Sequence, residues 1–178
     1  MKKQVLFPIL LTIISIGLLS FTLPKRLHKK VTKEIKKTFE IENVLLEKID
    51  VSDNVNQQLV TKINNNKLFK ISSSNEFVGY AYVDKAPSKT DEFDYLILLD
   101  KNLIIAKTKV LIYREDYGGE IGSKRWLKQF IGKKSTDKLK YEREIMAISG
   151  ATISASSMTI AINNFLHNLE ILHKNEVL

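Results

Sequence analysis

A short segment of small and hydroxyl-bearing residues, 148–154, joins two stretches of different pattern. Residues 139–147 are predicted to be extended. Residues 154–174 are predicted to be helical, because apolar side chains recur there at helical spacing. Gly150 permits a sharp turn or a close approach of the backbone to a ligand. The segment therefore ends at a helix start, where unpaired N–H groups and the positive end of the helix dipole point into one space.

Three hydroxyl groups, those of Ser149, Thr152 and Ser154, surround the predicted turn. A strand, a turn of small residues and a helix N-terminus together suit a phosphate or another anion. The alternative is a helix capped by Ser or Thr with no ligand. On the local pattern alone, the helix without a ligand is the commoner of the two.

The order Ser149-Gly150-Ala151-Thr152 resembles the signature of the FMN-binding domain family, Asp-x-x-Ser/Thr-Gly-Ala-Thr/Ser. That family includes membrane-anchored subunits of sodium-translocating NADH:quinone reductases and of Rnf-type electron-transport complexes. In those subunits a flavin transferase joins the last Thr or Ser to the FMN phosphate through a phosphoester bond. The resemblance implies that Thr152 is the attachment residue and that the three residues before it form its turn. The family's Asp falls on Met146, which has no carboxylate, so FMN binding is implied more directly than covalent attachment.

A glycine-rich loop over residues 114–123, the glycine loop, resembles the family's second block, Glu-Thr-Pro-Gly-x-Gly. Glu115 and Gly118 match that block, whereas Asp116 and Tyr117 replace its Thr and Pro. In the family this loop lies beside the flavin. The resemblance therefore implies cofactor-binding roles for Glu115, Tyr117, Gly118 and Gly119. It also makes Tyr117 and Trp126 candidates for stacking on the flavin ring, and Arg114, Lys124 and Arg125 candidates for balancing flavin charge.

The positive charge of the chain is concentrated at its start. Residues 1–40 hold nine Lys or Arg and two acidic residues, whereas residues 41–178 hold 19 and 18. This distribution favours contact with anionic lipid over nucleic-acid binding, which needs a basic face on the domain. The chain has no Cys, which excludes disulfides and thiolate metal sites, and its three His give no metal-binding pattern.

Val5 to Leu23 form an uncharged run of 19 residues. As a helix it would span roughly 28 Å, close to the thickness of a bilayer core. The run fits an uncleaved anchor or a cleaved signal peptide, and we favour the anchor. The lysines that follow it favour a cytoplasmic domain by the positive-inside bias. The resemblance implies the extracytoplasmic (periplasmic) side instead, because the flavin transferase acts there, and we predict that side.

An amphipathic helix is predicted from Leu27 to Phe39, where apolar side chains recur every four residues and lysines fill most positions between them. Two interpretations of this helix remain open. It lies on lipid or on a partner subunit as a stalk, or it packs against its own domain.

The remainder of the chain carries strand and turn signals that predict an antiparallel sheet. Residues 95–99 are almost wholly apolar and are expected to be central in it. Gly79, inside a predicted strand, indicates a bulge or a close backbone approach. The other expected elements are a helix over 53–66, hairpins that pair 68–72 with 77–83 and 93–99 with 103–113, and a helix over 124–130.

The expected fold class is α+β, with an antiparallel sheet packed on a C-terminal helix and preceded by a single N-terminal transmembrane or signal helix. We divide the chain into a membrane anchor or signal segment (1–24), a basic helix and linker (25–64) and an FMN-binding domain (65–178).

The resemblance implies a membrane-anchored FMN-binding protein that transfers electrons within a redox complex and is not an independent enzyme. The implied partners are a redox partner protein or quinone-reductase-type complex, a flavin transferase and membrane lipid. An alternative is a flavin-free structural or assembly subunit that keeps the fold, and Met146 supports it. A reductase with noncovalent FMN ranks last, because the sequence shows no nicotinamide-binding motif.

Overall fold

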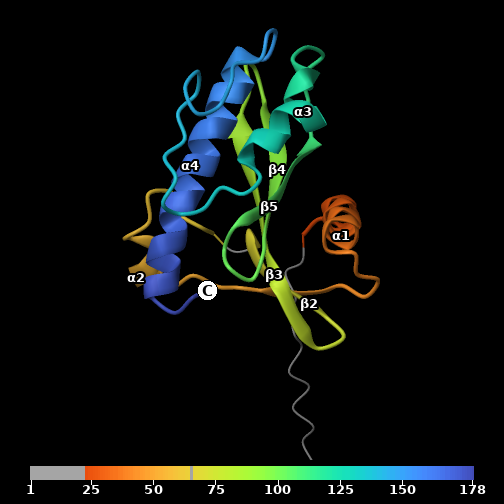
Figure 1. Cartoon of the computed structure of the whole chain (residues 1–178), viewed down its shortest axis with the longest axis vertical. Coiled ribbons are helices and arrows are strands. Elements are labelled where there is room, and N and C mark those ends of the chain that lie inside the picture. Colours follow the sequence, from red (N-terminus) through yellow and green to blue (C-terminus); the bar gives the residue numbers. More distant parts are fainter. Residues whose placement is uncertain (1–22, 65) are drawn as a thin grey trace, which may run out of the picture.

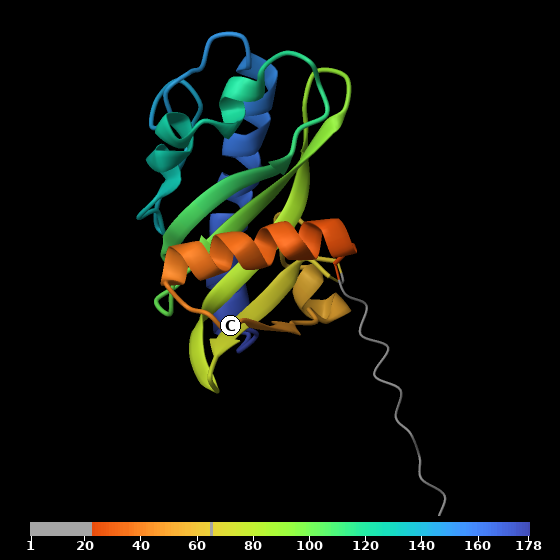
Figure 2. The same cartoon turned by 90° about the vertical axis from the view of Figure 1, so that its right-hand side faces the viewer.

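The computed structural model describes residues 23–64 and 66–178 of the chain. These residues form three layers: helix α4 (Thr152–Lys174), a sheet, and helix α1 (Lys25–Phe39) on the opposite face of the sheet (Figure 1). Figure 2 shows α1 crossing in front of the sheet, with α4 behind it. The predicted membrane segment lies outside the described residues, apart from Leu23. Among the described helices, none has the length and apolar character needed to cross a bilayer.

A five-stranded antiparallel sheet runs in the order β1-β2-β3-β4-β5, so strands that follow one another in the chain are neighbours. With α4 packed against it, this sheet confirms the predicted α+β class. Both predicted hairpins are present. The turn between β2 and β3 has positive φ at Ser74 and Asn75, as a two-residue hairpin turn requires. The strands are β1 (Leu45–Lys48), β2 (Leu68–Ser73), β3 (Glu76–Pro87), β4 (Glu92–Leu99) and β5 (Ile105–Ile112).

Strand β4 is buried on both faces. Ile97 and Leu99 belong to the apolar core beneath α4, whereas Leu96 and Leu98 belong to a second core beneath α1. All four side chains are fully buried. This double burial explains why the strand is almost continuously apolar instead of alternating, and it confirms the predicted central position of residues 95–99.

The apolar stripe of helix α1 packs against its own domain, which confirms one of the two interpretations of its amphipathic pattern. Val31 and Ile35 are fully buried, and they share a core with Ile71, Leu96 and Leu98. The lysines lie on the remaining faces. The helix ends at Glu40, which adopts the left-handed conformation and donates its N–H to the carbonyl of Lys36.

The predicted helix over 53–66 is shorter than expected. Helix α2 covers only Asp53–Asn56, capped by the hydroxyl of Ser52, which accepts from the N–H of Val55. Asparagine side chains bind the backbone that follows. Asn56 accepts from Ile63 N–H, and Asn168 of α4 accepts from Val60 N–H and donates to the Thr61 carbonyl. These bonds replace the helical ones.

The predicted extended segment over 139–147 is wrong, because this segment joins no strand of the sheet. Only Leu139 and Ile145 are buried, and the polar residues between them form a tight turn in which Ile145 N–H donates to the Lys140 carbonyl. Glu142 in that turn has a φ of 63°. Two apolar anchors separated by five polar residues lack the alternation of a half-buried strand.

The predicted helix over 124–130 is present in two parts, α3 (Lys124–Leu127) and the 3₁₀ helix η2 (Lys128–Phe130). A further 3₁₀ turn, η1 (Gly119–Gly122), precedes them. The hydroxyl of Ser123 accepts from the N–H of Trp126 and caps α3, as predicted.

Gly79 lies against the end of β4, as the sequence predicted. A Cβ atom at this position would lie 2.1 Å from the carbonyl oxygen of Leu99. We expect Gly79→Ala to lower the free energy of unfolding by about 1–3 kcal/mol, since the backbone of one strand must move. Gly122→Ala is the matched control because an added Cβ there meets nothing within 4 Å. Urea denaturation followed by circular dichroism measures both variants, and equal losses would contradict the close approach as the cause.

Candidate functional site

The first turn of α4 lacks a cap. Its N-cap residue, Ala151, offers no side-chain acceptor, and the turn contains no acidic residue. The N–H groups of Thr152, Ile153 and Ser154 have no hydrogen-bond partner among the described residues. Gly150, just before the turn, has a φ of +79° and open space where a Cβ would stand. The uncapped helix start is therefore accessible to an anion.

The glycine loop packs directly against this helix start. Gly118 has a φ of +82°, and a Cβ added to it would lie 2.7 Å from the hydroxyl oxygen of Tyr113 and 3.1 Å from the carbonyl oxygen of Gly150. Only glycine fits both the conformation and the space. The two sequence blocks that resemble the flavin family are therefore adjacent in the folded chain.

A hydrogen bond ties the end of β5 to α4. The hydroxyl of Tyr113 lies 3.0 Å from the hydroxyl of Ser154, which is buried within the first turn of α4. The ring of Tyr113 also packs near Phe93 of β4, with ring centroids 6.0 Å apart. Tyr113 thus fixes the position of the helix start relative to the sheet.

Glu115 holds a second loop in place. One of its carboxylate oxygens accepts from the N–H of Thr90 at 2.6 Å, from the Thr90 hydroxyl at 3.2 Å and from the N–H of Asp91 at 3.3 Å. These bonds stabilise the charged form. The pKa of the Glu115 carboxyl is consequently lowered, first by the backbone N–H of Thr90 and next by the hydroxyl of Ser88. Glu115 therefore acts as a clamp between the glycine loop and residues 88–91.

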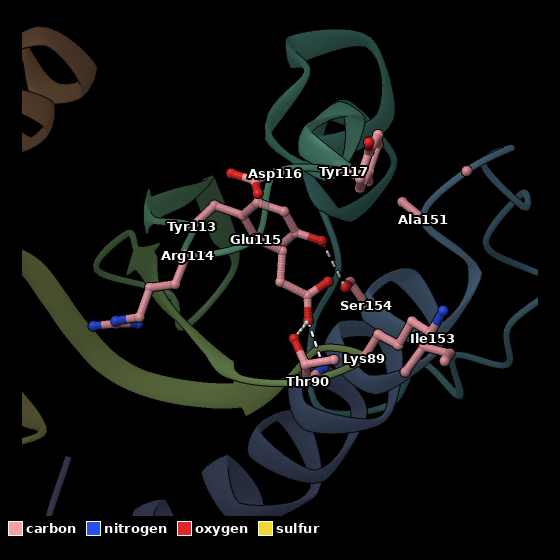
Figure 3. A pocket seen from close by; sticks show the side chains of 11 residues that line it. Lys89, Thr90, Tyr113, Arg114, Glu115, Asp116, Tyr117, Ala151, Ile153 and Ser154 are labelled. Carbon is pink, nitrogen blue, oxygen red and sulfur yellow. Dashed lines mark hydrogen bonds between the residues drawn. The ribbon is translucent and has the colours of Figure 1, made fainter.

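The loop over residues 88–91, the glycine loop and the start of α4 line a cleft of about 470 Å³ (Figure 3). We call it the α4 cleft. Its volume lies within the range of small-molecule sites. Lys89 lines the edge of the cleft, and its side chain makes no salt bridge with another described residue. The lining comes from the loop residues Lys89 and Thr90, from Tyr113–Tyr117, and from Gly150, Ala151, Ile153 and Ser154.

The residues predicted from the sequence are distributed around this cleft. Glu115, Tyr117, Gly150 and Ala151 line it, and the ring of Tyr117 is 85% exposed. Gly118 lies behind the lining, and Gly119 begins η1 with open space around it. Thr152 is exposed on the first turn of α4 outside the lining, and Ser149 is exposed on the other side of the turn.

Ser149 borders a neighbouring cleft of about 400 Å³, the Met146 cleft, which also contains Arg125 and Trp126. Met146 is 68% exposed, but its backbone is bound on both sides. Its N–H donates to the side-chain oxygen of Gln129 at 2.7 Å, and its carbonyl accepts from Nε1 of Trp126 at 2.8 Å. These bonds hold the segment that leads into the Gly150 turn.

Three side chains suggested by the sequence face away from the α4 cleft. Trp126 is buried against Phe130 and supports the Met146 backbone. The guanidinium of Arg114 pairs with Asp94 and donates to the Glu92 carbonyl, and Figure 3 shows it pointing away from Tyr117 and Ala151. Lys124 belongs to another surface, between α3 and α1. Two aromatic side chains therefore line this cleft, and Tyr117 is the more exposed of them, because the hydroxyl of Tyr113 is bound to Ser154.

Sequence reasoning missed Lys89, Thr90 and Tyr113. The sequence assigned no role to the first two, and it predicted the third only as the end of a strand. Thr90 is bound to Glu115 and Tyr113 to Ser154, residues far away in the chain, and Lys89 is the neighbour of Thr90 in the loop that Glu115 holds. No local pattern around residues 88–91 indicates such contacts.

The family model for the FMN-binding domain matches residues 89–167. This range begins at the loop held by Glu115 and includes β4, β5, the glycine loop and most of α4. Residues 89–167 are therefore an FMN-binding domain, as the sequence resemblance predicted. Comparison with curated proteins finds no match to this chain.

The hydrogen bonds that Glu115 accepts from Thr90 and Asp91 should depend on pH. Because the carboxyl pKa is lowered in the folded protein, the clamp is complete above the ordinary pKa of glutamate and is lost as the pH falls through the lowered value. We expect the amide NMR signals of Thr90 and Asp91 to titrate below the ordinary glutamate range. In Glu115→Gln these amides should exchange faster with solvent, whereas Asp116→Asn, in the same loop, should leave them unchanged. Titration at the ordinary glutamate pKa would contradict the clamp.

Proposed function

We propose that this protein is an electron carrier that binds FMN in the α4 cleft. The observation that carries the proposal is the close approach of Gly118 to the carbonyl of Gly150, where an added Cβ would lie 3.1 Å from the oxygen, so that the two sequence blocks meet at one helix start. The cleft is large enough for a small ligand and combines a cation, a helix N-terminus and an exposed aromatic ring.

The residues around the helix start fit the flavin phosphate. The N–H groups of Thr152, Ile153 and Ser154 supply donors with no competing acceptor among the described residues, and Lys89 adds a positive charge. Gly150 leaves space for a phosphate to approach the backbone. Tyr117 offers a ring that can stack on the isoalloxazine. When bound, FMN supplies redox chemistry that side chains do not provide.

Thr152 is the residue to which we assign covalent attachment. It is exposed, and its hydroxyl makes no hydrogen bond to another described residue. In the attachment step the Thr152 oxygen forms a bond to the flavin phosphorus and loses its proton. A phosphoanhydride bond of a flavin dinucleotide breaks, and a nucleoside monophosphate leaves. An exposed first-turn hydroxyl is accessible to the flavin transferase that this step requires.

We further propose that the chain is anchored in a membrane by the uncharged run from Val5 to Leu23, with the domain on the extracytoplasmic side. The domain then passes electrons to or from a redox partner protein or a quinone-reductase-type complex. The support for the anchor is the uncharged run itself. The support for the extracytoplasmic side is the family of residues 89–167, set against the positive-inside bias of the lysines that follow the run.

A second candidate is a flavin-free structural or assembly subunit. The observation that favours it is Met146, an exposed thioether at the position where the family has a carboxylate. Protein purified with a flavin supply distinguishes the candidates. A yellow, fluorescent protein supports the electron carrier, whereas a colourless protein that takes up no FMN supports the flavin-free subunit.

Substitution of Thr152 tests the site of attachment. In cells that co-express a flavin transferase, we expect the wild-type protein to gain the mass of FMN less water. Thr152→Ala should abolish this gain because the nucleophilic oxygen is missing, whereas Thr152→Ser should keep most of it. Ser156→Ala, further along the same helix, is the matched control and should keep the adduct. Intact-protein mass and in-gel flavin fluorescence measure the outcome, and covalent flavin on Thr152→Ala would refute the assignment.

Restoring the family carboxylate provides an independent test. Met146 is exposed, so Met146→Asp should leave the fold intact. We expect it to raise the fraction of protein that carries covalent flavin, measured by mass at a fixed time of co-expression. Ala147→Asp introduces the same charge one residue away and should not raise that fraction. An equal effect of both variants would show that added charge, and not its position, is responsible.

A further inference from the structure

A groove lined mainly by lysines lies beside α1, at the β5 edge of the sheet. It has a volume of about 170 Å³ and is formed by α1, β5 and the α3–η2 segment. Figure 2 shows α1 lying across the sheet on this side. We call it the lysine groove. Its lysines come in pairs from three separate segments: Lys33 and Lys37, Lys107 and Lys109, and Lys124 and Lys128.

The strand register explains why the β5 lysines belong to this face. Lys107 pairs with Leu98 and Lys109 pairs with Leu96 across the β4–β5 ladder. Both leucines point into the core beneath α1. Residues that pair directly across neighbouring strands lie on the same face of a sheet, so both lysines lie on the α1 side. Because β5 is the edge strand, their charged ends reach solvent beside the helix.

The groove has a large uncompensated positive charge. Within residues 23–64 and 66–178, Glu34 is the one acidic residue that lines it. None of the six lysines takes part in a salt bridge among the described residues. The residues outside the described part, 1–22 and 65, include no Asp or Glu that would compensate them. Like charges held together this way repel one another, so an anionic partner would stabilise the arrangement.

We propose that the lysine groove is a docking surface for anionic phospholipid headgroups. The position of α1 in the chain selects this partner. The helix begins at Lys25, two residues after the uncharged run ends at Leu23, so a membrane anchor would hold the groove close to the headgroup layer. Clusters of lysine beside a membrane segment bind anionic lipid surfaces.

Binding at this surface is electrostatic, without insertion of an apolar helix face. The apolar stripe of α1 is already covered by the sheet, since Val31 and Ile35 are fully buried. The side chain of Lys30 donates to the carbonyl of Leu111 and ties the helix to β5. An interfacial helix would instead need this stripe free to enter the lipid. Docking is therefore expected to weaken strongly as salt increases.

Docking through the lysine groove also leaves the α4 cleft open. Helix α4, whose first turn borders that cleft, lies on the far side of the sheet from α1 (Figure 1). A redox partner could then approach the cleft while the domain rests on the membrane. The inference does not depend on FMN binding, because no groove lysine lines the α4 cleft.

Amine labelling of the full-length protein tests the proposal. The protein is placed in nanodiscs of phosphatidylcholine, alone or mixed with phosphatidylglycerol, and the labelling rate of each lysine is measured by mass spectrometry. We expect the groove lysines to label more slowly in the anionic discs and to recover at high salt. Lys138, Lys140 and Lys174, which are exposed elsewhere, should label at the same rate in both.

A charge-matched pair of variants locates the effect. Each lysine at an anionic surface contributes roughly fivefold to the docked-to-free ratio. Lys107→Gln/Lys109→Gln should therefore lower this ratio by roughly 25-fold and restore fast labelling of Lys124 and Lys128 in anionic discs. Lys138→Gln/Lys140→Gln removes the same charge and should preserve the protection. Circular dichroism verifies that both variants are folded.

Two outcomes would overturn the proposal. Equal labelling of the groove lysines in both lipid mixtures would show that the headgroups do not bind there and would favour an acidic protein as the partner. Equal protection by inorganic phosphate in phosphatidylcholine discs would show that the groove binds a free anion and not a lipid surface. Neither outcome bears on the flavin adduct at Thr152, which is measured separately.

Discussion

The burial of β4 on both faces is the constraint on which the rest of the described structure depends. One face of this strand supports α4 and the other supports α1, two helices from opposite ends of the chain. The strand therefore has no polar face, and each helix must contribute an apolar stripe to cover it. The two covered faces carry the two surfaces to which we assign function. The α4 cleft forms at the start of one helix, and the lysine groove forms along the other.

The α4 cleft depends on the glycine at position 118, because no other residue fits there. Gly118 approaches the carbonyl of Gly150 so closely that a side chain would separate the glycine loop from the helix start. Glu115, three residues earlier, binds the backbone of residues 90 and 91. A single short loop thus positions two other segments, one through the absence of a side chain and one through a carboxylate. Both features lie within the motif that the sequence resemblance identified.

Much of this arrangement could be predicted from the sequence, because local patterns specify it. Alternation and turn residues predicted both hairpins, and helical spacing predicted α1 and α4. The extended prediction for residues 139–147 was wrong, because the polar residues between the buried Leu139 and Ile145 form a turn. The roles of Thr90 and Tyr113 were not predictable. They depend on hydrogen bonds between residues distant in sequence, which a local pattern does not encode.

The lysine groove shows why net charge is a poor guide to a folded surface. Residues 41–178 are almost neutral in total, which argued against a basic face on the domain. Folding nevertheless gathers Lys107, Lys109, Lys124 and Lys128 beside the lysines of α1, and it leaves the acidic residues of this part elsewhere. The same packing that buries the apolar stripe of α1 leaves only its charged faces exposed. The choice between a helix packed on its domain and a helix resting on lipid is then no longer exclusive, because one face of α1 can do the first while its lysines do the second.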